Sequence, residues 1–339
     1  MKKISPDRIR LSAAEARALA EASLSGIGYD AGQARIIADH VIDAALCGYE
    51  YSGLPKILNI PEYPRAKWPR KKLRVVRETE VSALIDGGNN VGMLALYQAA
   101  QIAIDKAHAR GFALVGAYNT WMTGRSAYYV EMITRADLVG IHTVAAFPAV
   151  APLGGTRAVL GTNPIAVGLP TAGDPVILDM GTSAYMMTEL RLRERLGELL
   201  PEGVAIDSEG RPTRDPAQAR LGALLTFGGH KGYGLAFIMQ ALGIVAGSAH
   251  DPGKEFGFLL IVFKPDLLVP LAEFKRQVSE LVARVQATPR QPGVDEIRIP
   301  SQRAFRERAR AGADGIDIDR QVYDALITLP QRCAMPAYE

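Results

Sequence analysis

The middle third of the chain limits the possible fold more than any other segment. Between residues 138 and 169, short apolar runs are separated by turn residues such as Pro148, Pro152, Gly161 and Pro164. Apolar runs of this length between turn residues are typical of short strands rather than of the helices of a bundle. We therefore predict that short strands and turns build the centre of the protein.

Helical patterns lie before and after this centre. Ser12 and Glu15 have the spacing of a capping box, which predicts a helix that runs to about residue 24. Asp30 is placed to cap a second helix. Residues 93–109 predict a long helix, and residues 271–286 predict an amphipathic one.

Three other segments bear on the fold. Residues 49–69 contain four prolines and are predicted to form a loop with little regular structure, and residues 176–180 predict a strand. The longest apolar stretch, residues 232–247, is about 16 residues long, whereas a membrane-spanning helix needs about 20. We therefore predict that this stretch is a helix buried inside the protein.

The length of 339 residues is enough for two or three domains. The sequence contains no repeat or flexible linker, so we predict interleaved parts rather than domains joined in series. These parts are a helical region over 1–70, a helix–strand segment over 71–135, a central sheet over 136–265 and a C-terminal helical region over 266–339 that packs back on the N-terminal part.

Charge and cysteine usage exclude several classes of protein. The 39 basic and 36 acidic residues give a net charge of +3, which is too balanced for a nucleic-acid-binding protein. Two cysteines, Cys47 and Cys333, cannot form a disulfide framework and indicate a reducing compartment. The first ten residues lack the apolar core of a secretory signal. We expect a soluble cytoplasmic protein with no nucleic-acid or membrane partner and no metal site.

Common nucleotide and hydrolase motifs do not occur. The chain lacks the G-x-G-x-x-G of a Rossmann unit, the P-loop string and the G-x-S-x-G elbow. Residues 227–234 read FGGHKGYG instead. Glycines allow the backbone to approach a ligand closely, a helix start favours anions, and Lys231 suits a phosphate or carboxylate. The alternative is a glycine-rich turn with an exposed lysine.

Four strings together resemble the type-2 malate/L-lactate dehydrogenase family in order and spacing. They read VAPLGG at 150–155, LGTNPI at 160–165, LDMGTS at 178–183 and GGHKGYGL at 228–235. The family includes ureidoglycolate dehydrogenase, diketogulonate reductase and Δ1-piperideine-2-carboxylate reductases. The resemblance implies an α/β (α+β-like) fold with a non-Rossmann NAD(P) site, a large mostly antiparallel sheet and interleaved domains, in which segment 71–135 contributes to the cofactor domain. It also implies a homodimer with its active site near the domain and subunit junctions.

The resemblance also implies which residues contact ligands. A carboxylate-bearing small molecule would contact Lys56, Thr162, Thr182 and Ser183. The family's arginine that clamps the substrate carboxylate is Lys56 here. NADPH or NADH, with NADPH slightly favoured, would lie against Met122, Thr123, Gly124, Arg125, Ser126, Asp179, Met180, Gly181, His230, Lys231, Gly232, Arg303 and Arg306.

The chain departs from the family at the residues that transfer a proton. The family's serine and general-acid histidine fall on Tyr51 and Ser52, a second histidine falls on Met122, and its aspartate or lysine falls on Glu189. A serine hydroxyl is too weak an acid to replace the histidine. The candidate catalytic residues are Tyr51, Ser52 and Glu189, with Tyr49 as a further candidate proton donor, and a tyrosine paired with Lys56 would have a lowered pKa. Ordinary loop packing is the alternative for Tyr49 and Tyr51.

These departures leave three hypotheses for the function. The first is an NAD(P)H-dependent oxidoreductase with a remodelled proton donor, which reduces the C=N of a cyclic imino acid or the C=O of a 2-oxo acid. A protonated imine is already activated, so the loss of the histidine favours C=N. The second is a diverged member of the family with unusual biosynthetic chemistry. The third is a catalytically inactive dimeric protein that binds a nucleotide.

Overall fold

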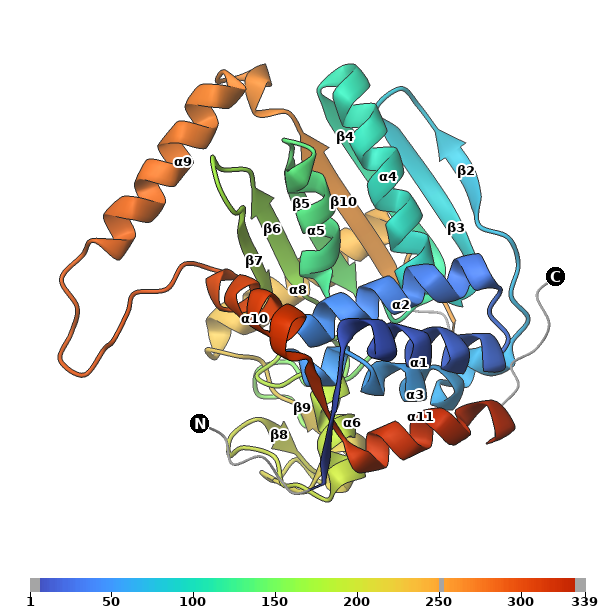
Figure 1. The fold of residues 1–339 in the computed structure, drawn as a ribbon. Coiled ribbons are helices and arrows are strands. Elements are labelled where there is room, and N and C mark those ends of the chain that lie inside the picture. Colours follow the sequence, from blue (N-terminus) through green and yellow to red (C-terminus); the bar gives the residue numbers. More distant parts are fainter. Residues whose placement is uncertain (1–6, 250–252, 333–339) are drawn as a thin grey trace.

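A seven-stranded sheet forms the centre of the computed structural model, which describes residues 7–249 and 253–332 (Figure 1). Cys333 lies outside the described residues. Across the sheet the strands are β2 (Arg74–Glu78), β3 (Ser82–Val91), β4 (Phe112–Trp121), β10 (Gly257–Phe263), β5 (Val139–Ala145), β6 (Ile165–Leu169) and β7 (Val176–Met180). Only β3 and β4 pair in parallel, so the prediction of a mostly antiparallel sheet in a mixed α/β protein is confirmed.

Helices cover both faces of this sheet. On one face, α4 (Gly92–Arg110) lies over β3 and β4, and α5 (Ser126–Arg135) lies over β5 and β6. On the other face, α8 (His230–Val245) packs against β5 and β10 (Figure 1). The left-handed conformation of Gly111, with φ of 82°, ends α4 and turns the chain into β4.

A helical layer lies across one end of the sheet (Figure 1). It comprises α1 (Ala13–Gly26), α2 (Ala31–Leu46), α3 (Pro55–Glu62), α10 (Gln302–Asp314) and α11 (Arg320–Arg332), with short 3-10 turns η1 (Glu50–Ser52) and η2 (Pro64–Lys67). The C-terminal elements return to the N-terminal ones, because β11 (Ile316–Asp319) pairs with β1 (Arg8–Leu11) and α11 packs against α1.

The remaining elements lie at the periphery. The α9 helix (Leu271–Gln286) has no buried residue and stands away from the body of the molecule (Figure 1). The others are α6 (Met187–Leu196), α7 (Pro216–Leu221), the 3-10 turn η3 (Pro265–Leu267) and the two-stranded pair β8 (Ala205–Ile206) and β9 (Ala223–Leu224). Within the described ranges no helix is long and apolar enough to cross a membrane.

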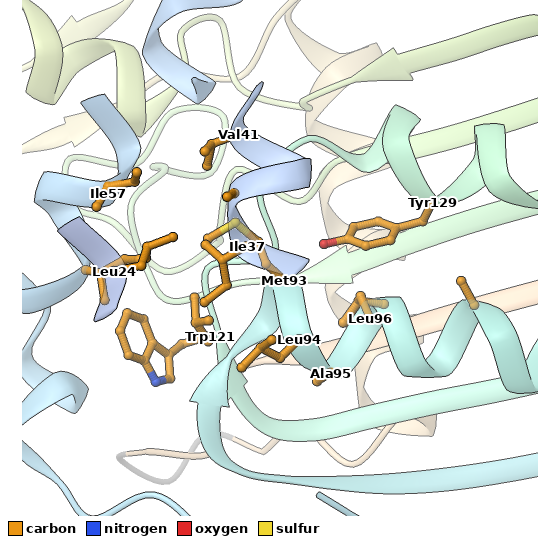
Figure 2. Packing of buried hydrophobic residues seen from close by; sticks show 14 of the residues in the cluster. Leu24, Ile37, Val41, Ile57, Met93, Leu94, Ala95, Leu96, Trp121 and Tyr129 are labelled. Carbon is orange, nitrogen blue, oxygen red and sulfur yellow. The ribbon is translucent and has the colours of Figure 1, made fainter. Parts of the chain in front are cut away.

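The helical layer and the sheet share one apolar core (Figure 2). Figure 2 shows Leu24, Ile37 and Ile57 from three different helices close to Met93 and Trp121. These five side chains are at most 1% exposed. Burial of this extent fixes α3 and the end of β4 relative to each other, and the cavity described below lies between these elements.

Several helix predictions are confirmed in detail. Ser12 and Glu15 form the reciprocal hydrogen bonds of a capping box at the start of α1. The Asp30 carboxylate accepts a hydrogen bond from Gln33 N and caps α2. The predicted bounds of α9 and β7 agree with the observed ones.

Two predictions are wrong. Residues 49–69 contain α3 and two 3-10 turns and are not a loop with little regular structure. Pro55 occupies the first turn of α3, where the N–H that proline lacks would form no hydrogen bond within the helix. The apolar stretch 232–247 is a helix, as predicted, but it is not buried in this chain. Only four residues of α8 are buried, whereas Phe237 and Ile244 are 57% and 60% exposed.

Candidate functional site

Six predicted site residues from three separate parts of the sequence line one cavity of about 120 Å³. The cavity lies among α3, the segment that follows β4, the ends of β5 and β10, and the start of α6. Its wall is largely apolar, with methionine and phenylalanine side chains beside a few polar groups. The six residues are Ser52, Lys56, Met122, Thr123, Gly124 and Thr162.

The turn before α3 places Ser52 and Lys56 in this cavity. Gly53 lies so close to α2 that a Cβ atom at this position would be 2.9 Å from Ala45 Cβ. Lys56 N then donates a hydrogen bond to Gly53 O at 3.0 Å and begins the helix. The absence of a side chain at Gly53 therefore allows Ser52 and Lys56 to reach the cavity from consecutive turns.

Lys56 carries a buried positive charge. Lys56 is only 4% exposed. Burial and, to a smaller extent, the nearby charge of Arg191 lower the pKa of its amine from 10.5 to about 8. In the described part of the chain, Nζ has no hydrogen bond to protein and no ion pair. An unpaired buried ammonium is costly, so this side chain is suited to an anionic ligand or to a proton transfer.

The segment after β4 is held in an unusual conformation. Met122 and Gly124 have φ values of 58° and 83°, and a Cβ atom on Gly124 would be 2.0 Å from His40 Nε2. Arg125 N donates a hydrogen bond of 2.8 Å to His40 Nε2. Burial, and then the charges of Lys56 and Arg125, lower the pKa of His40, so this imidazole is neutral and acts as an acceptor.

The side chains of this segment divide between the cavity and the interior. Met122 and Thr123 line the cavity, and Ser126 is buried at the start of α5. The guanidinium of Arg125 instead pairs with Asp43 at 2.6 Å and lies 5.2 Å from the ring centre of Tyr49. Arg125, a predicted cofactor contact, is therefore not among the residues that line the cavity.

Hydrogen bonds bring the predicted substrate strings together. Thr162 O accepts hydrogen bonds from Thr182 N at 2.9 Å and from Thr182 Oγ1 at 3.1 Å, and Phe227 N donates to Thr182 O at 3.2 Å. The Ser183 hydroxyl donates to Tyr185 O at 2.7 Å. Thr162 lines the cavity, whereas the hydroxyl groups of Thr182 and Ser183 already bond to the backbone.

The β7 string lies beside the start of α5. The Asp179 carboxylate accepts a hydrogen bond from Ala127 N at 2.7 Å, and Met180 ends the strand. Gly181 directly follows this strand. A Cβ atom there would be 2.7 Å from the sulfur of Met186, which lines the cavity, so the glycine makes room for this methionine.

The start of α8 fits an anionic group such as a dinucleotide phosphate. Gly228 and Gly229 have φ values of 56° and 61°, and a Cβ atom at either position would meet nothing within 4 Å. Among the residues that the structure describes, no side chain caps this helix, and His230 and Lys231 are exposed. Gly232 packs too closely on Phe227 O for a side chain, at 1.9 Å from its Cβ position. The open backbone amides and the lysine are the donor set that a phosphate requires.

Tyr51 and Glu189 lie outside the residues that line the cavity. The hypothesis that Tyr51 pairs with Lys56 and has a lowered pKa is wrong, because burial and then the Glu189 carboxylate raise the pKa of Tyr51. Glu189 lies in the first turn of α6, with its carboxylate 3.9 Å from Arg193.

The two α10 arginines lie apart from the cavity as well. The Arg303 guanidinium lies 4.6 Å from the ring centre of Tyr49, and Arg306 is exposed and pairs with Glu296 at 2.5 Å. Their assignment to the adenosine end of a cofactor stays a prediction.

Sequence reasoning missed several residues that line the cavity, chiefly Asn59, Tyr63, Met187 and Arg191. Met187 and Arg191 are four residues apart on α6, so helical spacing predicts that they share a face. That face was not assigned to the site because no family string includes Arg191.

Comparisons with known proteins identify the same family as the four sequence strings. A family model described as malate/L-lactate dehydrogenase matches residues 11–327. The malate/(S)-sulfolactate dehydrogenase of Methanothermus fervidus is 33% identical over 329 residues, which cover 93% of this chain and 96% of the relative.

Solved structures give the same result. The malate dehydrogenase of Pyrococcus horikoshii is 28% identical with a TM-score of 0.86, and the match covers 99% of both chains. The Δ1-piperideine-2-carboxylate reductase of Pseudomonas syringae is 29% identical with a TM-score of 0.80, covering 95% of this chain and 99% of that one.

Proposed function

The chain belongs to the malate/L-lactate dehydrogenase family, and from this premise we propose that it is a nicotinamide-dependent oxidoreductase of a small carboxylate. The membership makes it a dehydrogenase-type enzyme of hydroxy or oxo acids. The observation that carries the finer proposal is the cavity itself, which brings Thr162, a predicted substrate contact, together with two positive side chains, Lys56 and Arg191. A carboxylate of the substrate would offset this positive charge.

The cofactor would be NADPH or NADH, with NADPH slightly favoured, bound outside a Rossmann unit. When bound, it supplies or accepts the hydride. The backbone of residues 228–232 and Lys231 would hold its phosphates, and the segment 122–126 would lie near the nicotinamide. The apolar wall, including Met122, Phe147 and Phe256, would exclude water from the reacting carbon.

Two substrate classes fit this cavity, a 2-oxo acid and a cyclic imino acid. Ser52 stands where the family has its general-acid histidine, and a protonated imine needs no strong acid when hydride arrives. This replacement and the likeness to a piperideine-2-carboxylate reductase favour the imino acid. The buried Lys56 favours the oxo acid, because it can supply a proton to the developing alkoxide.

A fluorescence titration with NADPH and NADH tests the proposal first. We expect saturable binding of at least one, and weaker binding by Lys231→Ala. The protein loaded with the tighter nucleotide is then given 2-oxo acids and cyclic imino acids while the absorbance of the reduced nicotinamide is followed. No binding of either nucleotide at millimolar concentration would favour an inactive relative of the dehydrogenases instead.

A homodimer and a cytoplasmic location belong to the same proposal. The α8 helix exposes Phe237, Ile238, Ile244 and Val245 at 51–60%, which is an apolar surface that a second copy of this chain would cover. The location rests on cysteine usage, since Cys47 is buried and unpaired.

Light scattering during size-exclusion chromatography tests the dimer. We expect twice the chain mass for the wild type and a single chain for Ile244→Glu. Leu221→Glu, at a residue of α7 that is 70% exposed, is the matched control and should stay dimeric. A wild-type monomer would contradict the homodimer.

A further inference from the structure

Two positive side chains from different elements enter the same cavity without a negative partner. Lys56 comes from α3 and Arg191 from α6, and neither side chain forms a hydrogen bond or ion pair within the residues that the structure describes. The neighbouring arginines of α6 differ, because Arg193 pairs with Glu198 at 3.2 Å and Arg195 pairs with Glu62 at 3.0 Å. Arg191 is therefore the arginine of α6 that is left for a ligand.

The cavity offers few groups that can exchange a proton near neutral pH. The Ser52 hydroxyl is too weak an acid. The Tyr63 ring stacks on Trp121 with centres 4.8 Å apart, and burial raises the pKa of its hydroxyl. Lys56, with its pKa lowered to about 8, is the cavity group whose two protonation states are both available between pH 7 and 9.

We propose that Lys56 transfers the proton and that Arg191 binds the substrate carboxylate when this protein interconverts a 2-hydroxy acid and its 2-oxo acid. The inference rests on the proposed function. Oxidation of the hydroxy acid breaks one C–H and one O–H bond: the hydride goes to the oxidised nicotinamide, the proton goes to the neutral Nζ of Lys56, and a C=O bond forms. Reduction reverses each transfer, and Lys56 takes its next proton from water.

The two roles are exchanged relative to the resemblance, which makes position 56 the carboxylate clamp. An arginine suits a clamp because it is always charged and presents two parallel donors, whereas a lysine amine can lose its proton. Here the guanidinium comes from α6 instead, which leaves the amine of α3 free to exchange a proton. The apolar wall keeps that amine poorly solvated.

The other charged groups near Lys56 are neutral, paired or exposed, so they do not change the role proposed for its amine. His40, on α2, is buried and neutral. Charged groups on the other elements packed against α3 have partners or are exposed: Glu50 with Arg8, Arg65 with Asn89, Arg17 with Asp39, and the exposed Arg320 and Asp324. In the described part of the chain, the charge that acts on Lys56 is that of Arg191.

The Lys56→Arg variant separates a proton donor from a clamp. If Lys56 transfers the proton, Lys56→Arg lowers kcat about 10²- to 10⁴-fold and leaves KM within a few fold, since arginine keeps the charge but cannot release a proton. If Lys56 is only a clamp, the variant keeps the wild-type kcat, and the proposal is wrong. Arg191→Gln is expected to raise KM about 10- to 100-fold. Arg220→Gln, at an arginine paired with Glu194, is the control.

Binding of oxamate, an isostere of a 2-oxo acid that is not reduced, gives a readout without turnover. At pH 9 Lys56 is mostly neutral, so a carboxylate held beside it by Arg191 draws up to about one proton from the buffer. Titration calorimetry in two buffers of different ionisation enthalpy measures this uptake, with and without reduced nucleotide. We expect uptake in the wild type and none in Lys56→Arg.

The outcomes separate this inference from the proposed function. Binding without proton uptake, or unchanged binding by Arg191→Gln, would overturn the inference even if the protein reduces oxo acids. A wild type that binds no nucleotide would overturn the proposed function, while oxamate titration of the protein alone still decides whether Arg191 holds a carboxylate.

Discussion

Replacing Lys56 by methionine is expected to stabilise the protein. The side chain is buried with its pKa lowered from 10.5 to about 8. A tenfold change in a protonation equilibrium is worth about 1.4 kcal/mol, so holding the ammonium in the folded protein costs about 3 kcal/mol at pH 7. Methionine has a similar length and no charge, so Lys56→Met should raise the free energy of unfolding by about this amount at neutral pH.

The sign of the pH dependence follows from the two pKa values. Below pH 8 both the folded and the unfolded protein carry the proton, and the cost is fully present. Between pH 8 and 10.5 the unfolded chain binds more protons than the folded one, so the wild type gains stability as the pH rises. The advantage of Lys56→Met should therefore fall to about 1.5 kcal/mol at pH 9.5.

Urea denaturation at fixed protein concentration, at pH 7 and pH 9.5, measures both quantities. The pKa of His40 depends in part on Lys56, but burial, the larger cause, keeps this imidazole neutral at both pH values. Groups distant from Lys56 titrate alike in the two proteins and cancel in the difference. A variant that is less stable than the wild type at pH 7 and shows no narrowing of the difference at pH 9.5 would refute a buried, unpaired ammonium at this position.

Three further substitutions test the framework of the site. Gly124→Ala places a Cβ atom against His40 and should weaken nucleotide binding and lower the melting temperature, measured by fluorescence titration and calorimetry. Asn163→Ala removes three hydrogen bonds in the turn after Thr162 and should cost about 2–4 kcal/mol in urea denaturation. Arg308→Gln leaves the buried Glu131 with one guanidinium partner and should cost about 2 kcal/mol by the same measurement.

Local chemistry accounts for the elements that were predicted well. The Ser12–Glu15 capping box and the left-handed Gly111 depend on residues within one turn of the chain, so their patterns are legible in the sequence. The prediction of a loop over 49–69 is wrong because a proline breaks a helix only in its interior, whereas Pro55 begins one. The prediction that the α8 helix is buried is wrong for a different reason. An apolar helix in a sequence does not specify which surface covers it.

The candidate site was predicted in part for similar reasons. The family resemblance located Ser52, Lys56 and Thr162, because the family pattern assigns each of them a position along the chain. Arg191 was missed, since its entry into the cavity depends on how α6 packs against η1, the turn before α3. The pairing of Tyr51 with Lys56 failed because nearness in sequence does not place two side chains in contact across a 3-10 turn.

The departures from the family pattern depend on one another. A histidine at the position of Ser52, close to Lys56 and Arg191, would add a third basic group to one small cavity, and the neighbouring positive charges would keep it neutral. Met122 in place of a second histidine keeps the wall apolar, and the same apolar wall lowers the pKa of Lys56. An amine that replaces an imidazole as proton donor needs such a wall. The replacements at Ser52 and Met122 therefore support a relocated proton transfer better than a loss of activity.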